Sequence, residues 1–359
     1  MLPLPDTTTA TRRNIVRKYK LSEFPDPRPF LHIRCGDDIL DKLVEAGIKG
    51  DGIRWADVLC EGPLHLHADD RQRQKERAAY IAARYQIPLT ETYREILGAD
   101  YRVDQCVRYD ETVLWFEADL FDQVILVYLL ARLARLADEA RISLICIGSF
   151  PRVRRFIGLG QLTPAQLATL LPQRRRVTPE QFALAGRAWA AFNAPDPGEL
   201  IRLSRERDAA LPFLPAAIRR YLAEYPSTRN GLSRTEQRAL EAIAAGARTP
   251  AEAFERVQRR EQRPFMGDWM FHAVIRGLAS GKQPAIEGDH PRLARLHDRE
   301  LHRSSVRLTA AGRKLLAGET YWCRLSGLAR SIGGVHFRGA EPRWRWDSSR
   351  GRIVERRPK

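Results

Sequence analysis

The sequence predicts an α/β protein whose first part is a Rossmann-like open parallel sheet. Short apolar runs that resemble buried strands alternate with segments that have helical spacing. The strand-like runs cover residues 30–35, 52–60, 111–117 and 142–148. The helix-like segments cover residues 38–46, 70–97 and 120–139. Strands that alternate with helices of this length pair in parallel, with the connecting helices packed on the sheet.

A helical segment is expected after the last of these strands, over residues 156–228. Thr163 and Thr178 each precede a proline, the arrangement of a helix cap followed by a first-turn proline. The stretch "PSTRNG", which ends at Gly231, is rich in turn formers and marks a boundary.

A basic winged-helix-like domain is expected over residues 229–359. Ser233 and Glu236 form a capping box, and two further helices are expected from Thr249 and from Gly267. A short strand then turns into a helix at Thr309, as after the wing of such domains. The segment "GVHFRGAEPRWRWD" predicts a C-terminal β-hairpin with aromatic and aliphatic side chains on one face and arginines on the other. The predicted divisions are residues 1–28 (a flexible basic arm), 29–155, 156–228 and 229–359.

The positive charge is concentrated in the last third of the chain. The net charge is +16, and residues 229–359 carry 27 basic and 14 acidic side chains, a net charge of +13. Such a step indicates a surface that faces an anionic partner, DNA or RNA, or a protein. The third helix offers Asp268, His272 and Arg276 on its polar side, with few side chains for reading bases. The residues predicted to contact nucleic acid are Arg259, Arg260, Arg263, Arg276, Arg303, Arg307, Arg343 and Arg345.

Acidic residues recur where the predicted parallel strands end. Because the carboxyl ends of parallel strands share one edge of a sheet, we expect these acids to line a ligand site there. Magnesium with a phosphorylated ligand would suit such a site, with arginines after the fourth strand as phosphate partners. The predicted ligand-binding residues are Gly36, Asp37, Asp38, Asp57, Glu61, Asp119, Asp122, Arg152 and Arg155. The alternative is that Asp37 and Asp119 only cap the helices that follow them.

Two common nucleotide-binding motifs are absent from the sequence, and one cluster of possible metal ligands is present. Neither G-x-G-x-x-G after the first strand nor G-x-x-x-x-G-K-[ST] occurs, which disfavours standard dinucleotide and P-loop sites. The segment "HLHADD" places His65, His67, Asp69 and Asp70 together, and either a metal site or a surface cluster fits it.

The expected location is the cytoplasm. Five cysteines form no C-x-x-C pair, which favours a reducing compartment. No apolar run approaches the roughly 18 residues that span a bilayer, so no membrane contact is expected.

Several motifs follow one another along the chain and carry a resemblance to a known family. They are "HIRCGDD" from His32, "WADVLCEGP" from Trp55, "DLFDQ" from Asp119, "STRNGLSRTE" from Ser227, "GGVHFRG" from Gly333 and "WRWD" from Trp344. By these motifs the chain resembles an uncharacterised bacterial family that carries only a domain-of-unknown-function label. The resemblance implies an N-terminal α/β domain and a C-terminal winged-helix-like region, and it supplies no activity.

The leading functional hypothesis is a ligand-sensing α/β domain coupled to a basic winged-helix domain that contacts nucleic acid or a partner protein. The alternative is an enzyme that performs metal-assisted phosphoryl or nucleotidyl transfer, or hydrolysis, at the acidic edge of the sheet. A purely structural interaction module is a third hypothesis. The observation that best separates these three hypotheses is whether Asp37, Asp57, Glu61 and Asp119 converge in one pocket.

Overall fold

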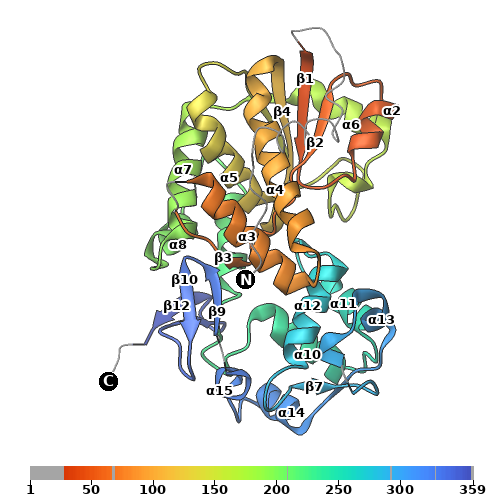
Figure 1. Ribbon diagram of the computed structural model, residues 1–359, viewed down its shortest axis with the longest axis vertical. Coiled ribbons are helices and arrows are strands. Elements are labelled where there is room, and N and C mark those ends of the chain that lie inside the picture. The colour runs from red at the N-terminus through yellow and green to blue at the C-terminus, as the bar shows by residue number, and fades with distance from the viewer. Residues whose placement is uncertain (1–27, 67–68, 208, 292, 328, 357–359) are drawn as a thin grey trace.

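The computed structural model describes residues 28–66, 69–207, 209–291, 293–327 and 329–356. An α/β part, red to green in Figure 1, lies against a C-terminal part that is cyan to blue. The predicted basic arm lies outside the described residues, apart from Arg28, with which the first strand begins.

A five-stranded sheet forms the centre of the α/β part. Across the sheet its strands are β2 (Asp51–Arg54), β1 (Arg28–Arg34), β4 (Tyr109–Glu117), β5 (Ile142–Ile147) and β6 (Arg175–Arg176). The first four pair in parallel and β6 pairs antiparallel to β5, which confirms the predicted α/β, Rossmann-like sheet. β2 is shorter than expected because residues 55–60 leave the sheet.

Helices cover both faces of this sheet, which explains why β4 is a continuous apolar run. Leu114 and Phe116 belong to a core that includes the helix of residues 120–133. Val113 and Trp115 point to the opposite face, where they pack with residues of two short helices, Leu40–Glu45 and Pro164–Leu170. The period of two along a strand thus divides β4 between two cores.

The helices of the α/β part extend through the predicted helical segment. They are α2 (Leu40–Glu45), α3 (Asp70–Tyr85), α4 (Leu89–Asp104), α5 (Leu120–Leu133), α6 (Pro164–Leu170), α7 (Pro179–Asn193), α8 (Gly198–Leu203) and α9 (Leu214–Leu222). Thr163 and Thr178 cap α6 and α7 with capping boxes, as predicted. The single helix expected over 70–97 is two helices, because Gln86 adopts a left-handed φ of 57° and Pro88 follows it.

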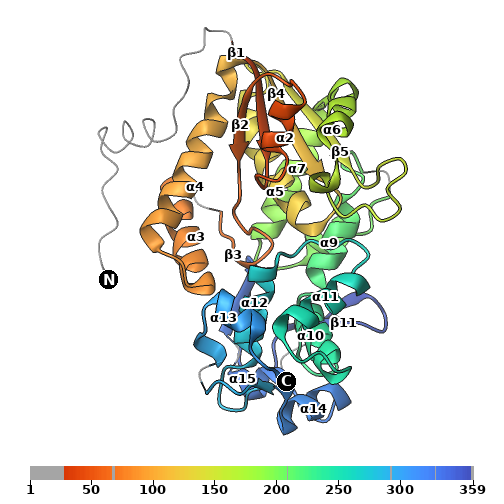
Figure 2. The same cartoon turned by 90° about the vertical axis from the view of Figure 1, so that its right-hand side faces the viewer.

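Short helices dominate the C-terminal part. They are α10 (Arg234–Ala244), α11 (Pro250–Arg260), α12 (Asp268–Leu278), α13 (Asp298–Arg303), α14 (Ala310–Ala317) and α15 (Trp322–Ser326). Ser233 caps α10 through the predicted capping box, and Thr309 caps α14. The two-residue strands β7 (Ile286–Glu287) and β8 (Arg307–Leu308) pair with each other. α12 packs against α3, so it lies at the contact between the two parts (Figure 2).

The single C-terminal hairpin predicted from the sequence is wrong. The strands are β9 (Ala329–Gly333), β10 (Val335–Arg338), β11 (Trp344–Asp347) and β12 (Arg352–Glu355), and they form two hairpins, β9–β10 and β11–β12. Tight turns explain this pairing, because Gly333, the last residue of β9, and Gly351, directly before β12, have φ angles near +60°. β9 also pairs in parallel with β3 (Gly62–Pro63), which joins the two parts (Figure 1).

All five cysteines are free thiols. Within the described ranges, none of the helices has the length and apolar character that crossing a bilayer requires.

Candidate functional site

The predicted acidic edge lies at the carboxyl ends of β1 and β4. The chain places β2 on one side of β1 and β4 on the other, so the strand order reverses between β1 and β4. Ligands of open α/β sheets bind outside such a reversal. Arg34 ends β1 and Glu117 ends β4, so both side chains lie at this point.

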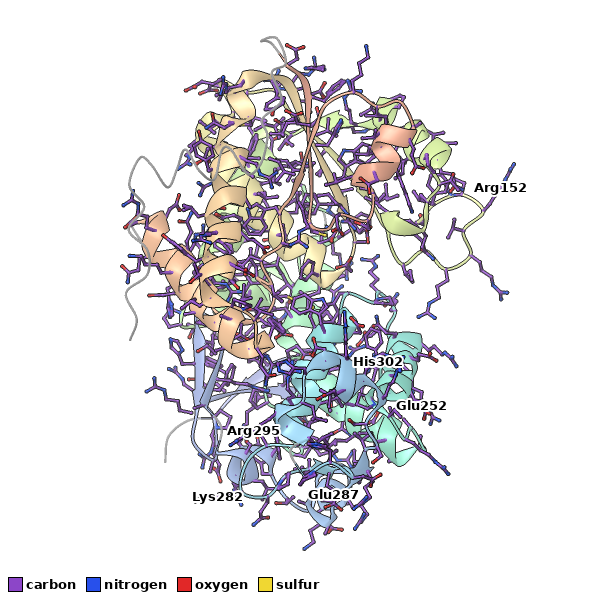
Figure 3. The ribbon with its side chains drawn as sticks, turned by 45° about the vertical axis from the view of Figure 1, so that its right-hand side comes forward. Arg152, Glu252, Lys282, Glu287, Arg295 and His302 are labelled. Atoms are coloured by element: carbon purple, nitrogen blue, oxygen red, sulfur yellow. The ribbon has the colours of Figure 1, made fainter. Side chains whose placement is uncertain are left out.

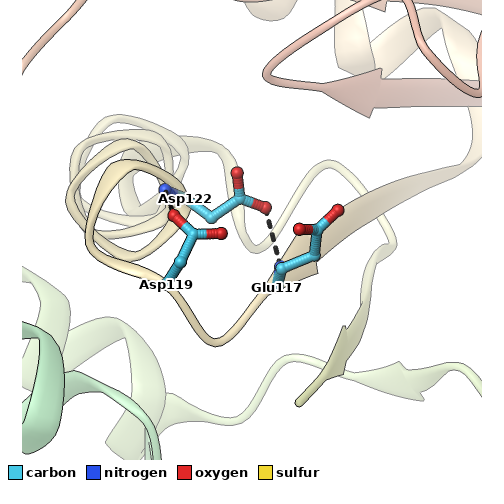
Figure 4. Close-up of side chains that lie close together, drawn as sticks. All are labelled: Glu117, Asp119 and Asp122. Atoms are coloured by element: carbon cyan, nitrogen blue, oxygen red, sulfur yellow. Dashed lines mark hydrogen bonds between the residues drawn. The ribbon is translucent and has the colours of Figure 1, made fainter. Parts of the chain in front are cut away.

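Three carboxylates contact the guanidinium of Arg34, of which Glu117 and Asp122 are buried and Asp38 is exposed. Its Nη1 donates to Asp122 Oδ2 at 2.5 Å and its Nη2 donates to Glu117 Oε1 at 2.5 Å. Its Nε donates to Asp38 Oδ1 at 3.2 Å. Asp119 completes the acidic cluster, and one oxygen from each of Glu117, Asp119 and Asp122 lies within 4.8 Å of the others (Figure 4).

The cluster carries more carboxylates than the one arginine neutralises. Burial, followed by the charge of Asp122, raises the pKa of Glu117 to about 9. The same two causes raise the pKa of Asp119 to about 7. Each group therefore favours its protonated form more strongly than it would in water.

A loop covers this edge of the sheet. The backbone N–H of Leu159 donates to Glu117 Oε1 at 2.6 Å. A Cβ on Gly158 would lie 2.7 Å from Glu117 Oε2, and one on Gly160 would lie 2.6 Å from Asp38 Oδ2. With this loop above and Arg34 inside, the carboxylates that we expected to hold magnesium are engaged by the protein's own cation and backbone.

The two capping predictions have different outcomes. Asp119 caps α5, because its Oδ1 accepts from the backbone N–H of Asp122 at 3.0 Å. Asp37 is exposed and does not cap α2, because that helix begins after Ile39, two residues further along.

Asp57 belongs to a different, structural cluster. It is buried and accepts three hydrogen bonds from Arg77 of α3, at 2.7–3.1 Å. The remaining donors of Arg77 reach the carbonyl oxygens of Val58, Glu61 and Pro63. A single guanidinium thus holds the whole "DVLCEGP" loop, and Asp57 is its counter-ion.

Glu61 faces a cleft between the two parts of the molecule. Its Oε2 accepts from Arg84 Nε at 3.3 Å and from the hydroxyl of Tyr85 at 3.0 Å. Arg84 also donates to the carbonyl oxygen of Ala273 in α12, at 3.0 Å. Asp37, Asp57, Glu61 and Asp119 therefore do not converge in one pocket.

This cleft has a volume of about 680 Å³ and is lined by four of the sequence motifs, with Leu120 contributed by "DLFDQ". Glu61 to Pro63 come from "WADVLCEGP", and Ser233 and Glu236 from "STRNGLSRTE". His336 to Arg338 come from "GGVHFRG". Its apolar wall includes Tyr80, Phe265, Trp322 and Phe337.

The two arginines predicted as phosphate partners lie away from the acidic cluster. Arg152 is exposed, has a φ of 66°, and points outward from its loop (Figure 3). Arg155 donates to the carbonyl oxygen of Gln258 at 2.7 Å, so it connects this loop to α11.

Most of the arginines predicted to contact nucleic acid have partners within the chain. Ion pairs hold Arg259 to Glu255, Arg260 to Glu241, Arg276 to Asp298, Arg307 to Glu287 and Asp289, and Arg343 to Glu355. Arg276 is also buried, as is His272, so of the three polar side chains predicted for α12 only the acidic Asp268 is exposed. Arg263 donates to the carbonyl oxygen of Ala118, Arg345 is half-buried, and Arg303 is exposed.

The described residues of the "HLHADD" segment have separate partners. Asp69 caps α3 and Asp70 pairs with Arg132, whereas His65 contacts Glu76 and His336. His67 lies outside the described residues.

Sequence reasoning missed Arg34, Arg77 and Arg84, the cations that neutralise the predicted acids. Arg77 and Arg84 are seven residues apart in α3, a spacing that places both on one helix face. That spacing was the available signal. For Arg34 the signal was its place at the end of an apolar strand beside the predicted acids, because a buried arginine needs a charged partner.

Scanning the chain against models of protein families finds no match, and searching the curated proteins finds none either.

Proposed function

We propose that the cleft between the two parts is the binding site for a small organic anion. The observation that carries this proposal is the meeting of four distant motifs around one cavity of about 680 Å³. Small-molecule sites are concave, mostly apolar and of roughly 300–1,000 Å³, with a few polar groups that fix orientation.

The charges of the lining favour an anion. Glu61 is matched by Arg84, Glu224 by Arg220, and Glu236 by Arg330, whose Nη1 lies 2.9 Å from the Oε1 of Glu236. Arg338 is exposed and has no ion pair within the described part of the chain. It supplies a cation for a phosphate or carboxylate, while the aromatic wall suits a ring or an aliphatic body.

The cleft also explains how binding would be sensed. Arg84 contacts Glu61 on one side and the backbone of α12 on the other. A ligand that displaces Glu61 from Arg84 would therefore alter the contact between the two parts. We include this coupling in the proposal, in which the α/β part reports ligand occupancy to the C-terminal part.

Filling the cleft tests the proposal. Gly277 of α12 lines it, and a Cβ there has no neighbour within 4 Å. Gly277→Leu adds bulk without a clash at Cβ and favours the helix. Gly186→Leu is the matched control, because Gly186 is an exposed glycine of α7 with equally open surroundings.

The measurement is the shift in melting temperature with AMP, glucose 6-phosphate or citrate. We expect at least one of the three to stabilise the wild type and Gly186→Leu and to leave Gly277→Leu unshifted. A shift that survives Gly277→Leu, or no shift with any of the three, contradicts the proposal.

Contact with DNA or RNA is a second proposed function, through a winged-helix-like arrangement of α10–α12 with β7 and β8. It is favoured by Arg295, Arg299 and Arg303, which are exposed and form no ion pair among the described residues. In the full chain, replacing all three by alanine should weaken binding to mixed-sequence DNA and reduce its salt dependence.

The control for this test is Arg259→Ala, Arg307→Ala and Arg343→Ala together, which removes the same charge from ion-paired positions. Equal effects of the two triple variants would indicate that only net charge matters. Absence of binding at low salt would leave a protein as the partner of this basic region. The alternative of metal-assisted phosphoryl transfer at the sheet edge has less support, because Arg34 occupies the centre of the acidic cluster.

A further inference from the structure

Two histidines that are 271 residues apart in sequence lie side by side at the rim of the cleft. His65 follows β3, and His336 lies in β10. The parallel pair β3–β9 and the antiparallel pair β9–β10 bring them together. Their ring centroids are 5.4 Å apart, and His336 lines the cleft.

The Nε2 atoms of the two rings face each other at 3.4 Å. The Nδ1 atom of His65 lies 3.2 Å from Glu76 Oε2, and that of His336 lies 2.6 Å from Ser331 Oγ. A carboxylate only accepts, so His65 carries its proton on Nδ1 and presents a lone pair at Nε2. Because the hydroxyl of Ser331 both donates and accepts, His336 is able to present its own Nε2 lone pair toward the same point.

This geometry matches two neighbouring ligands of a tetrahedral metal ion. Metal–nitrogen bonds of about 2.0–2.1 Å at tetrahedral angles place the two nitrogens about 3.4 Å apart. Glu76 and Ser331 occupy the positions of the outer hydrogen-bond partners that orient ligating histidines. We infer that His65 and His336 bind a zinc-class divalent ion through their Nε2 atoms.

The ion would keep coordination positions open toward the cleft. Both side chains are solvent-accessible, and His336 forms part of the cleft lining, so water or an anionic ligand can reach the ion. Imidazole ligands select zinc, cobalt, nickel or copper over magnesium, which prefers oxygen. The site does not depend on the proposed cleft ligand, because the ion alone is sufficient to test it.

The test is calorimetric titration of the full chain with Zn²⁺ and, separately, with Co²⁺, whose visible absorption reports the coordination geometry. We expect one ion per chain and loss of that binding in both His65→Ala and His336→Ala. Ser331→Ala should weaken binding by roughly tenfold, because it removes an outer partner. His297→Ala is the matched control, since His297 is exposed and lies in a different segment.

Circular dichroism verifies that each variant is folded, which is expected because neither histidine is buried. Absence of binding by the wild type, or unchanged binding in either His65→Ala or His336→Ala, overturns the inference. Equal weakening by His297→Ala also overturns it, because it would show unspecific surface binding.

Discussion

Asp57 and Asp37 are two acidic residues with opposite environments. Asp57 is buried against Arg77, whereas Asp37 is exposed. Removing one partner of a buried ion pair costs about 3–5 kcal/mol, because the other charge stays buried and unpaired. We expect Asp57→Ala to lower the free energy of unfolding by this amount and Asp37→Ala to change it by less than about 0.5 kcal/mol.

Urea unfolding of the two variants beside the wild type measures this difference. If both variants were destabilised alike, Asp37 would have a structural role that its position does not show.

Glu117 predicts a dependence of stability on pH. Its pKa rises on folding from 4.5 to about 9, so between these values the folded chain holds a proton that the unfolded chain releases. The free energy of unfolding therefore falls as pH rises through this window. Glu117→Gln should flatten the decline between pH 6 and pH 9, as measured by urea midpoints.

Glu111→Gln is the contrasting variant for this measurement. Glu111 accepts from Arg174 and Ser143, and these hydrogen bonds lower its pKa. Replacing Glu111 by Gln should lower the free energy of unfolding both at pH 6 and at pH 9. If the free energy of unfolding fell equally steeply between pH 6 and pH 9 in the wild type and in Glu117→Gln, the proton held by the folded chain would reside on another carboxylate of the cluster.

At the scale of elements, the "GG" of "GGVHFRG" allows the β9–β10 turn to approach α7 closely. A Cβ on Gly333 would lie 2.3 Å from the carbonyl oxygen of Phe192, and one on Gly334 would lie 2.1 Å from that of Asn193. Gly339 also has a positive φ, of 76°, but has no neighbour within 4 Å of its added Cβ. Gly333→Ala should cost about 1–3 kcal/mol more than Gly339→Ala, because only the first adds overpacking.

Thermal unfolding of Gly333→Ala, Gly334→Ala and Gly339→Ala provides the comparison. Similar losses at Gly333 and Gly339 would mean that backbone strain, and not the approach to α7, requires the glycine.

The sequence predicted those elements that depend on local chemistry. The parallel strands follow from apolar runs, and the starts of α6, α7 and α10 follow from their capping residues. The hairpin prediction failed because strand partners are chosen by turns and tertiary contacts, and β9 could not be recognised in "ARSIG". The break at Gln86 was missed although Pro88 signalled it, because a proline inside a helical pattern ends or kinks the helix.

At the scale of the whole molecule, three of the acids predicted for the sheet edge, Asp38, Asp119 and Asp122, lie in one cluster, but their partners and the cleft were not predicted. The cluster forms because β1 and β4 are neighbouring parallel strands, which brings together Arg34, Glu117, Asp119 and Asp122. A parallel sheet is enough to predict that such strand ends share one edge. The cleft depends on how the C-terminal part packs against α3. Such packing joins residues more than 100 positions apart and has no local pattern.

The pairing of β3 with β9 has a kinetic consequence. Residues near position 62 cannot complete their sheet until residues near position 332 are available, and contacts between such distant positions form slowly. We expect this small sheet to form after the rate-limiting step of folding. Ile332→Val should then accelerate unfolding and leave refolding nearly unchanged, whereas Val113→Ala in β4 should slow refolding. Stopped-flow measurements of both variants decide this, and a slower refolding of Ile332→Val would show that β3 and β9 pair early.

During synthesis, the edge of β3 would remain unpaired until β9 emerges, so this edge is where an incomplete chain is most exposed to pairing with wrong partners.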